Sequence, residues 1–478
     1  MVEKVELEPL GWPLIRLALV VVVGGIAPLV DTTVVNVALH TTAADLHAST
    51  AAIGWVTTAY LLTLAVTVPV TAWASDRFGA KRLWISGLVL FLIGSGLCAL
   101  APNFGALVAF RAVQGIGGGI MLPVLQTILV RAAGPAKVGR VLTIVTLVVT
   151  IAPIAGPLVG GGIVDAASWR WVFVINLPIC AAAILLALRY VPRTPTQAEK
   201  RLDVPGVLLL GVGTAALLYA LSNAATHRGN AAAYVWMPLI GGLVLTAGFV
   251  VWSLVRGTRS AIPVRLLAHR AFGAATATLF LTGVALYGAL FLIPLYFQQQ
   301  RGLSALSAGA VLALQGLGSL LTRWVGSLVD RIGARLIALV GVLLCAAATL
   351  PFAIATTSTS WVLLGAALIV RGGALSAVNI AITTGAFTDL SSDQVPAASA
   401  IVRLVQQLGG AGGTALLATI AGGIGAVSGF HSAFLWSIAL TLVAILPCIA
   451  IPAPKRLREM ATQHGRPHDP LPERPEVR

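Results

Sequence analysis

Two side chains of opposite charge, Asp31 and Arg111, lie inside apolar stretches, where a charge is costly unless it has a partner. Asp31 is the only carboxylate within any apolar stretch long enough to span a membrane, and Arg111 lies at a matching depth in another stretch. Because burial disfavours an ionised carboxylate and a nearby arginine favours it, a change in their separation would change proton affinity. The pair could therefore bind and release one proton. The alternative is a structural ion pair that locks two segments together.

The composition places these two charges in a membrane. Hydrophobic residues make up 58% of the 478-residue chain and charged residues only 10%, against roughly 25% in soluble domains. This balance excludes a soluble enzyme, a nucleic-acid-binding protein and a disordered scaffold. Stretches of spanning length occur at roughly 14–39, 52–74, 83–101, 104–130, 138–164, 171–190, 204–223, 235–255, 271–297, 305–328, 336–356, 361–387, 401–424 and 431–452.

The distribution of basic residues predicts the orientation of these fourteen spans. The net charge is +15, and of the 31 Lys and Arg residues only Arg170, Arg228 and Arg301 fall in loops assigned to the outside. Cytoplasmic loops of membrane proteins carry an excess of Lys and Arg. We therefore expect a multi-pass membrane protein with both termini in the cytoplasm, and no nucleic-acid partner despite the positive charge.

A long internal repeat divides the chain. Residues 76–80 (DRFGA) recur as 330–334 (DRIGA), 254 positions later, and Arg111 and Arg371 lie 260 positions apart. Both offsets exceed what six spans with short loops require, and the excess matches one inserted pair of spans. The predicted fold class is an all-α integral membrane protein with two six-helix bundles and a two-helix insert. The expected divisions are 1–192 for the N-terminal bundle, 193–268 for the insert, 269–455 for the C-terminal bundle and 456–478 for a disordered tail.

Each copy of the repeated segment is a short loop with an acid, several bases and a turn glycine. Gly79 and Gly333 permit a turn with positive φ. Asp76 and Asp330 could meet bases or helix ends of the opposite half when the inner side is closed. The alternative is that the bases only follow the positive-inside rule. The segment resembles the inner-loop signature of the major facilitator superfamily, GxLaDRxGxR. The resemblance implies gating roles for Asp76, Arg77, Gly79, Lys81 and Arg82 in the first copy and for Asp330, Arg331, Gly333 and Arg335 in the second.

Residues 152–161 (APIAGPLVGG) combine small residues with two prolines. Small residues permit close helix contacts, and prolines bend a helix. The segment resembles the antiporter signature gxxxGPxxGG, found in drug exporters of the superfamily, with Ala152 in place of the first glycine. The alternative is a generic kinked packing helix. The motif residues are Gly156, Pro157, Gly160 and Gly161.

Two further segments, 31–39 (DTTVVNVAL) and 169–178 (WRWVFVINLP), resemble the fourteen-span drug:H+ antiporter family of this superfamily. The resemblance covers residues 13–452 and includes the insert. It departs at His40, where the family usually has proline, and at Gln406-Gln407, where many members have Arg-Gln. It implies a major facilitator fold and export driven by an ion gradient.

We interpret the chain as a proton-coupled exporter of hydrophobic or amphipathic, cationic compounds across a bacterial plasma membrane, acting as a monomer. A dedicated exporter of one metabolite, lipid or siderophore is the alternative. A non-transporting scaffold or sensor is the alternative of a different class. The sequence contains no GxxxxGK[ST] or HExxH motif and no paired acids within a span, so we expect no enzyme activity, cofactor or metal site.

Substrate is expected to bind near the membrane midplane, between the two six-span halves. Candidate lining residues are polar or aromatic positions within apolar spans, and core packing is the alternative for each of them. Arg371 could compensate anionic groups, which leaves the charge of the substrate open. The candidates are Asn36, Trp55, Tyr60, Gln114, Tyr287, Phe291, Gln315, Arg371 and Asn379.

Overall fold

The computed structural model describes residues 11–193, 202–224, 232–257, 260, 262–322, 324–356, 358–387, 390, 394–423 and 426–451. Every regular element in these ranges is a helix. The predicted disordered tail, 456–478, lies outside the described residues. In chain order the elements are α1 (Trp12–Asp45), α2 (Thr50–Phe78), α3 (Ala80–Ala99), α4 (Phe104–Ala166), α5 (Trp171–Val174), α6 (Asn176–Tyr190), α7 (Val204–Asn223), the π-helix η1 (Ala232–Trp236), α8 (Met237–Arg256), the 3₁₀ helix η3 (Val264–Ala268), α9 (Arg270–Gln299), α10 (Ala305–Leu320), α11 (Val325–Ile332), α12 (Ala334–Ala353), α13 (Trp361–Ala386), α14 (Val395–Gly423), α15 (Ala426–Val443) and α16 (Ile445–Ala450).

Eleven helices in the described part of the chain are long and apolar enough to cross a membrane. Helices suit that solvent because they satisfy their backbone polar groups internally. Three predicted spans fall short of these criteria. Two coincide with shorter apolar helices, Ile151–Ala166 and Ala305–Leu320, and the third coincides with α14, which is long but carries Arg403 and a pair of glutamines. The chain is therefore an all-helical multi-pass membrane protein, and the count of fourteen spans stays a prediction.

The connection expected between spans 104–130 and 138–164 is helical, because α4 extends from Phe104 to Ala166. This helix cannot be straight. Arg111 contacts Asp31 and Gly160 lies against Val34, so two parts of α4 that are 49 residues apart pack on the same stretch of α1. At 1.5 Å per residue a straight helix would separate them by about 74 Å. The chain must therefore turn back on itself between these two parts.

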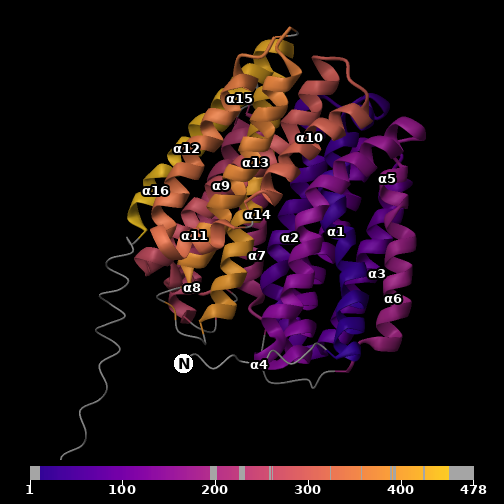
Figure 1. Ribbon diagram of the computed structural model, residues 1–478, viewed down its shortest axis with the longest axis vertical. Helices are drawn as coiled ribbons and strands as arrows, with labels where there is room; N and C mark the ends of the chain where they lie inside the picture. The colour runs from indigo at the N-terminus through magenta and orange to yellow at the C-terminus, as the bar shows by residue number, and fades with distance from the viewer. Residues whose placement is uncertain are drawn as a thin grey trace, which may run out of the picture.

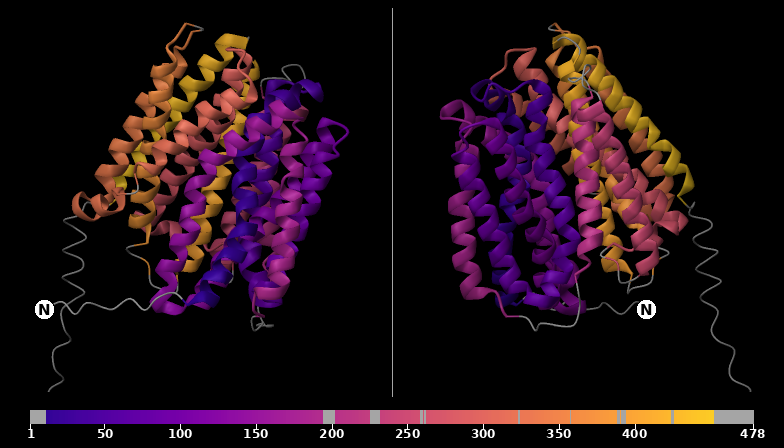
Figure 2. Two further views of the ribbon diagram at one scale, coloured as in Figure 1. Left: turned by 45° about the vertical axis from the view of Figure 1, so that its right-hand side comes forward. Right: turned by 180° about the vertical axis from the view of Figure 1, so that it is seen from behind.

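The helices form two groups that lie side by side (Figure 1). Helices α1 to α6 make up one side and α9 to α16 the other. Contacts between the groups run from α2 to α14, from α4 to α10 and from α1 to α9. Seen from behind, α7 and α8 lie between the two groups (Figure 2), and α7 touches both α2 and α14.

Both repeated loops turn at a glycine. Gly79 ends α2 with φ 84°, and Gly333 ends α11 with φ 90°. Residues with a Cβ rarely adopt positive φ, whereas glycine does so without a penalty. These two positions therefore need glycine for the tight connection into α3 and α12.

At the opposite end, which the sequence assigns to the outside, Asp45 lies beyond the predicted span 14–39 and joins α1 to the segment before α5. Its carboxylate accepts hydrogen bonds from Trp169 Nε1 at 2.9 Å and from Arg170 Nη1 at 2.7 Å. The indole hydrogen bond, with the arginine beside it, lowers the pKa of the Asp45 carboxyl from its ordinary value. This cluster fixes the end of α1 relative to α5.

Candidate functional site

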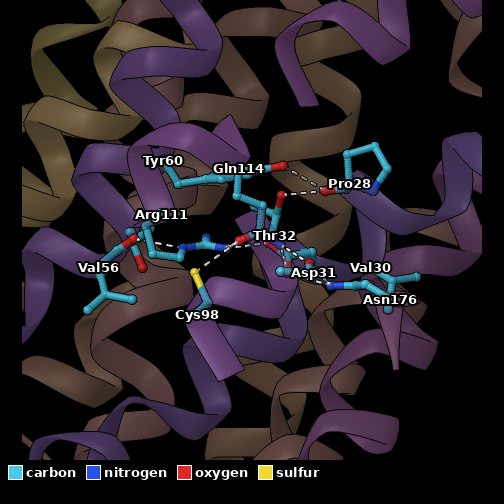
Figure 3. A network of polar contacts seen from close by, with 12 residues as sticks. Pro28, Val30, Asp31, Thr32, Val56, Tyr60, Cys98, Arg111, Gln114 and Asn176 are labelled. Carbon is cyan, nitrogen blue, oxygen red and sulfur yellow. Dashed lines mark hydrogen bonds and ion pairs between the residues drawn. The ribbon is translucent and has the colours of Figure 1, made fainter. Parts of the chain in front are cut away.

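Asp31 lies in a buried polar network formed by α1, α2, α4 and α6 (Figure 3). Its Oδ2 accepts a hydrogen bond from Arg111 Nη1 at 2.6 Å. Its Oδ1 accepts hydrogen bonds from Gln114 Nε2 and Asn176 Nδ2, both at 3.0 Å. Arg111 also donates from Nε to the Val56 carbonyl at 3.1 Å. Asp31 and Arg111 are each 1% exposed, so the ion pair is shielded from water on all sides.

A second set of contacts holds the partners of Asp31 in place. Gln114 Nε2 also donates to Ser95 Oγ at 2.6 Å, and Asn176 Nδ2 donates to the same oxygen at 3.1 Å. The Arg111 guanidinium carbon lies 4.2 Å from the centre of the Tyr60 ring, a cation–π distance. The arginine thus keeps favourable neighbours besides the carboxylate.

The helices around Asp31 approach one another closely because glycines line α1. A Cβ at Gly24 would lie 2.7 Å from Trp84 of α3 and 3.2 Å from Ala183 of α6. A Cβ at Gly160 of α4 would lie 2.9 Å from the Cα of Val34. Small residues let helix backbones come together in a membrane. The same packing brings donors from α4 and α6 within reach of one carboxylate on α1.

These contacts hold a buried carboxylate together with its countercharge. An ionised carboxylate in a dry interior is stable only while donors and a countercharge surround it. Asp31 has three such donors, one of them charged.

A cavity of about 380 Å³ lies between the two groups of helices. Its walls come from α1, α2 and α4 on one side and from α9, α10, α13 and α14 on the other. Pro28 and Thr32 line it from α1, on either side of Asp31 in the sequence, but Asp31 itself does not. The other lining residues are Leu29, Thr33, Leu64, Leu122, Ala152, Pro153, Leu286, Tyr287, Leu290, Gln315, Gly316, Ser319, Gly372, Leu375, Ser376, Asn379, Gln406 and Gln407.

Three of the nine candidate substrate-binding residues, Tyr287, Gln315 and Asn379, line this cavity. The other six do not. Gln114 and Tyr60 belong to the network around Arg111, and Asn36 accepts a hydrogen bond from Thr57. The remaining three are placed as follows: Trp55 lies 6.3 Å from the ring of Tyr219 in α7, Phe291 is fully buried next to Gly54, and Arg371 is buried behind Gln315.

The first inner loop carries an ion pair within its own group of helices. Asp76 Oδ1 lies 3.3 Å from Arg131 Nη2 in the middle of α4, and both side chains are partly exposed. Lys81 donates to the Leu188 carbonyl of α6 at 2.8 Å, and Arg77 and Arg82 are exposed. In the second loop Arg331 is exposed and Arg335 is half-buried, while the Asp330 side chain lies outside the described part.

The antiporter-like segment of α4 packs against both groups of helices. Gly156 and Gly160 face Thr33 and Val34 of α1. Gly161 faces α10, where an added Cβ would lie 2.5 Å from the Ala305 carbonyl oxygen. The Pro157 carbonyl contacts Gly309 of α10. The segment is therefore a seam of small residues along α10.

Several residues of this site were not predicted. Asn176 lies within segment 169–178, which resembles the antiporter family, so the sequence could have indicated this residue. Ser95 lies in an apolar stretch without a motif, so the sequence could not have indicated it. Gln406 and Gln407 were noted only as a departure from the family pattern, yet both line the cavity. Among the described residues, no group of three or more His, Cys, Asp or Glu side chains could hold a metal ion.

Comparison with known families agrees with this arrangement. Residues 21–414 match the family model of the Major Facilitator Superfamily. The chain belongs to the major facilitator superfamily. It is therefore a membrane transporter of small molecules, and superfamily transporters are not enzymes.

Individual relatives agree with this membership. The multidrug resistance protein B homolog of Mycobacterium tuberculosis (strain ATCC 25618 / H37Rv) is 37% identical over 410 residues, which cover 85% of this chain and 76% of that protein. A protein of Serratia proteamaculans (strain 568) named MdtD is 31% identical over 432 residues, covering 88% of this chain and 89% of that one.

Solved superfamily structures share the fold. The inward open xylose transporter XylE from E. coli superposes with a TM-score of 0.62 at 15% identity, over 94% of this chain and 99% of that one. A point mutant of the nucleoside transporter NupG gives a TM-score of 0.65 at 14% identity, over 92% and 99% of the two chains.

Proposed function

We propose that the protein is a proton-coupled exporter of hydrophobic or amphipathic compounds, working by alternating access in a bacterial plasma membrane. Asp31 binds the proton, and Arg111 is its countercharge, which loses its ionic partner when Asp31 is protonated. Substrate occupies the cavity between the two groups of helices. The chain crosses the membrane fourteen times as a monomer, with both termini in the cytoplasm. Two six-helix bundles rock about the cavity, and α7 and α8 form the insert.

The observation that carries this proposal is the isolation of Asp31. Among the described residues, the fully buried acids are Asp31 and Asp203. Asp203 begins α7 at the end of the molecule assigned to the cytoplasm, where it bonds Trp252 and lies 3.6 Å from Arg256. Of these two described acids, Asp31 is the one within a span, and it lies beside Arg111. A proton-driven pump needs one such group.

Protonation of Asp31 would remove the countercharge of Arg111. The arginine would keep the Val56 carbonyl, the Gln114 side-chain oxygen and the Tyr60 ring. The free energy of the buried Arg111 charge would then depend on how closely these neutral groups surround the guanidinium. An equilibrium between two arrangements of the helices can be shifted by such a difference. Protonation of Asp31 thereby shifts the equilibrium towards the arrangement in which the cavity opens to one side of the membrane.

The names of the relatives favour export of several compounds. A relative 37% identical is named as a multidrug resistance protein B homolog. The antiporter-like segment and the largely apolar cavity agree with hydrophobic cargo. A dedicated exporter of a single metabolite, lipid or siderophore is the second candidate, and it would respond to few compounds in a resistance profile of a pump-deficient host.

The proton step is tested by Asp31→Asn in sealed vesicles with an imposed pH gradient. We expect gradient-driven efflux to be abolished while substrate binding is retained. Arg111→Ala should also impair efflux and change its pH dependence. Asp45→Asn is the matched control, because it makes the same substitution in the same helix outside the buried network. Wild-type efflux by Asp31→Asn vesicles would refute the assignment.

A further inference from the structure

Arg371 of α13 is a buried cation whose hydrogen-bond partners in the described part of the chain are all neutral. It is fully buried, and its donors reach Thr349 Oγ1 at 3.2 Å, Gln315 Oε1 at 2.7 Å and the Ala285 carbonyl at 2.6 Å. All three acceptors are neutral. Among the residues that the structure describes, no acid lies within ion-pair distance of Arg371. Its positive charge is therefore solvated by dipoles but not neutralised.

The internal repeat relates Arg371 and its neighbours to the Asp31–Arg111 pair of the first half. Arg371 lies 260 positions after Arg111, and its acceptor Ala285 lies 254 positions after Asp31. These are the offsets that relate the two arginines and the two inner loops. The second half of the chain has thus kept the buried arginine, while a main-chain carbonyl stands where the first half has its acid.

Gln315 connects this charge to the cavity. An arginine has no acceptor, so the Gln315 oxygen must face it, and the amide nitrogen must face the other way. Gln315 lines the cavity, and its amide hydrogens have no acceptor among the described residues. It therefore presents two N–H donors backed by a cation.

The remaining lining residues add no charge. None of the described lining residues is an acid or a base. The Thr32 and Ser319 hydroxyls donate to main-chain carbonyls at 2.8 and 2.6 Å, so their hydrogens are not available to a ligand. Arg371 adds a positive electrostatic potential to the cavity because no described acid neutralises it, whereas the Asp31–Arg111 pair is neutral as a whole.

We propose that the cavity binds amphipathic compounds that carry a carboxylate or another anionic group, with the anion at the Gln315 amide and Arg371 as its countercharge. This inference rests on the proposed function, because it takes the cavity as the substrate site. It departs from the cationic substrate that the sequence suggested. A cation in the cavity would be repelled by the same arginine that attracts an anion.

The test uses two probes with one hydrophobic body, 9-anthracenecarboxylate and the ammonium compound 9-(aminomethyl)anthracene. Binding is measured by probe fluorescence with the full-length protein in phosphatidylcholine nanodiscs, without any gradient. The wild type should bind the carboxylate at least about tenfold more tightly than the amine. Gln315→Glu should abolish this preference, because its carboxylate would neutralise Arg371, just as Asp31 neutralises Arg111.

Two further variants separate charge from folding. Gln315→Leu removes the donors without adding charge, and it should weaken only the carboxylate. Gln300→Glu makes the same amide-to-acid change outside the cavity lining, and it should leave both affinities unchanged.

Equal or tighter binding of the amine to the wild type would overturn the inference, as would binding of neither probe up to its solubility limit. An unchanged preference in Gln315→Glu would also overturn it. Failure of the Asp31→Asn vesicle experiment would refute proton coupling but leave these binding results standing, so the two proposals fail separately.

Discussion

Asp165, in the last turn of α4, accepts a hydrogen bond from the backbone amide of Ala305, the first residue of α10, with 3.0 Å between Oδ1 and N. Its other oxygen accepts from the next amide, that of Leu306, at 2.9 Å. The carboxylate thus caps a helix that belongs to the other group, and the helix dipole favours it there. This contact joins the two groups at the end assigned to the outside.

Removal of that cap should weaken the contact between the two groups of helices at the end assigned to the outside. A helix cap contributes about 1 kcal/mol, so Asp165→Ala should shift the equilibrium towards an open outer end about fivefold. A single cysteine at the buried position Ala308 of α10, in a background without the four native cysteines, should then label faster from outside. Asp45→Ala is the control, because Asp45 bonds within its own group of helices. An unchanged labelling rate in Asp165→Ala would show that the cap does not hold this end closed.

Gly161 should tolerate no side chain. A Cβ there would lie 2.5 Å from the Ala305 carbonyl oxygen and from the Leu306 Cα, which are backbone atoms that cannot rotate away. Gly161→Ala should therefore separate α4 from α10 and abolish efflux, with a lower melting temperature in detergent. Gly162→Ala is a matched control one residue away, since its Cβ would meet only Leu306 Cδ1, at 3.9 Å. Equal activity of the two variants would contradict the close seam.

Gln114 should tune the proton step without binding the proton. It donates to Asp31 Oδ1 and accepts from Arg111, so it stabilises the ionised acid and holds the pair together. In Gln114→Leu the Asp31 carboxylate loses one of its three donors, and Arg111 loses an acceptor. Gradient-driven efflux in vesicles should then fall several-fold. Ser95→Ala touches the same network without touching Asp31, and a loss of efflux as large as that of Gln114→Leu would argue against a direct role for Gln114.

Cysteine labelling in sealed cells should test the orientation. Cysteines at Ser49 and Ser358, both exposed, should react with a membrane-impermeant maleimide from outside. A cysteine at Phe78 should react only after permeabilisation, because Phe78 is 48% exposed and belongs to the predicted inner loop. The neighbouring Ala80 is fully buried and would be a poor reporter. External reaction at position 78 would reverse the assignment.

The sequence by itself determined the class of the molecule and most of its helices. A span must bury its own backbone polar groups and expose apolar side chains to lipid, so length and hydropathy identify it without any tertiary contact. Local rules also determined the turns at Gly79 and Gly333, because their positive φ is a property of one residue. The charges at positions 31 and 111 stood out for the same reason, since a lone charge in an apolar stretch is costly wherever its partner lies.

Only the tertiary structure decided which side chains meet. The Asn176 amide donates to Asp31, which lies 145 positions earlier in the chain. The Asp165 carboxylate accepts from the amide of Ala305 in α10, 140 positions later. Whether a polar residue lines the cavity or fills the core depends on the rotation of its helix against its neighbours, which is why Gln315 lines the cavity and Arg371 lies behind it. Helix rotation is set by packing between glycine-rich faces far apart in the chain, and no local pattern encodes it.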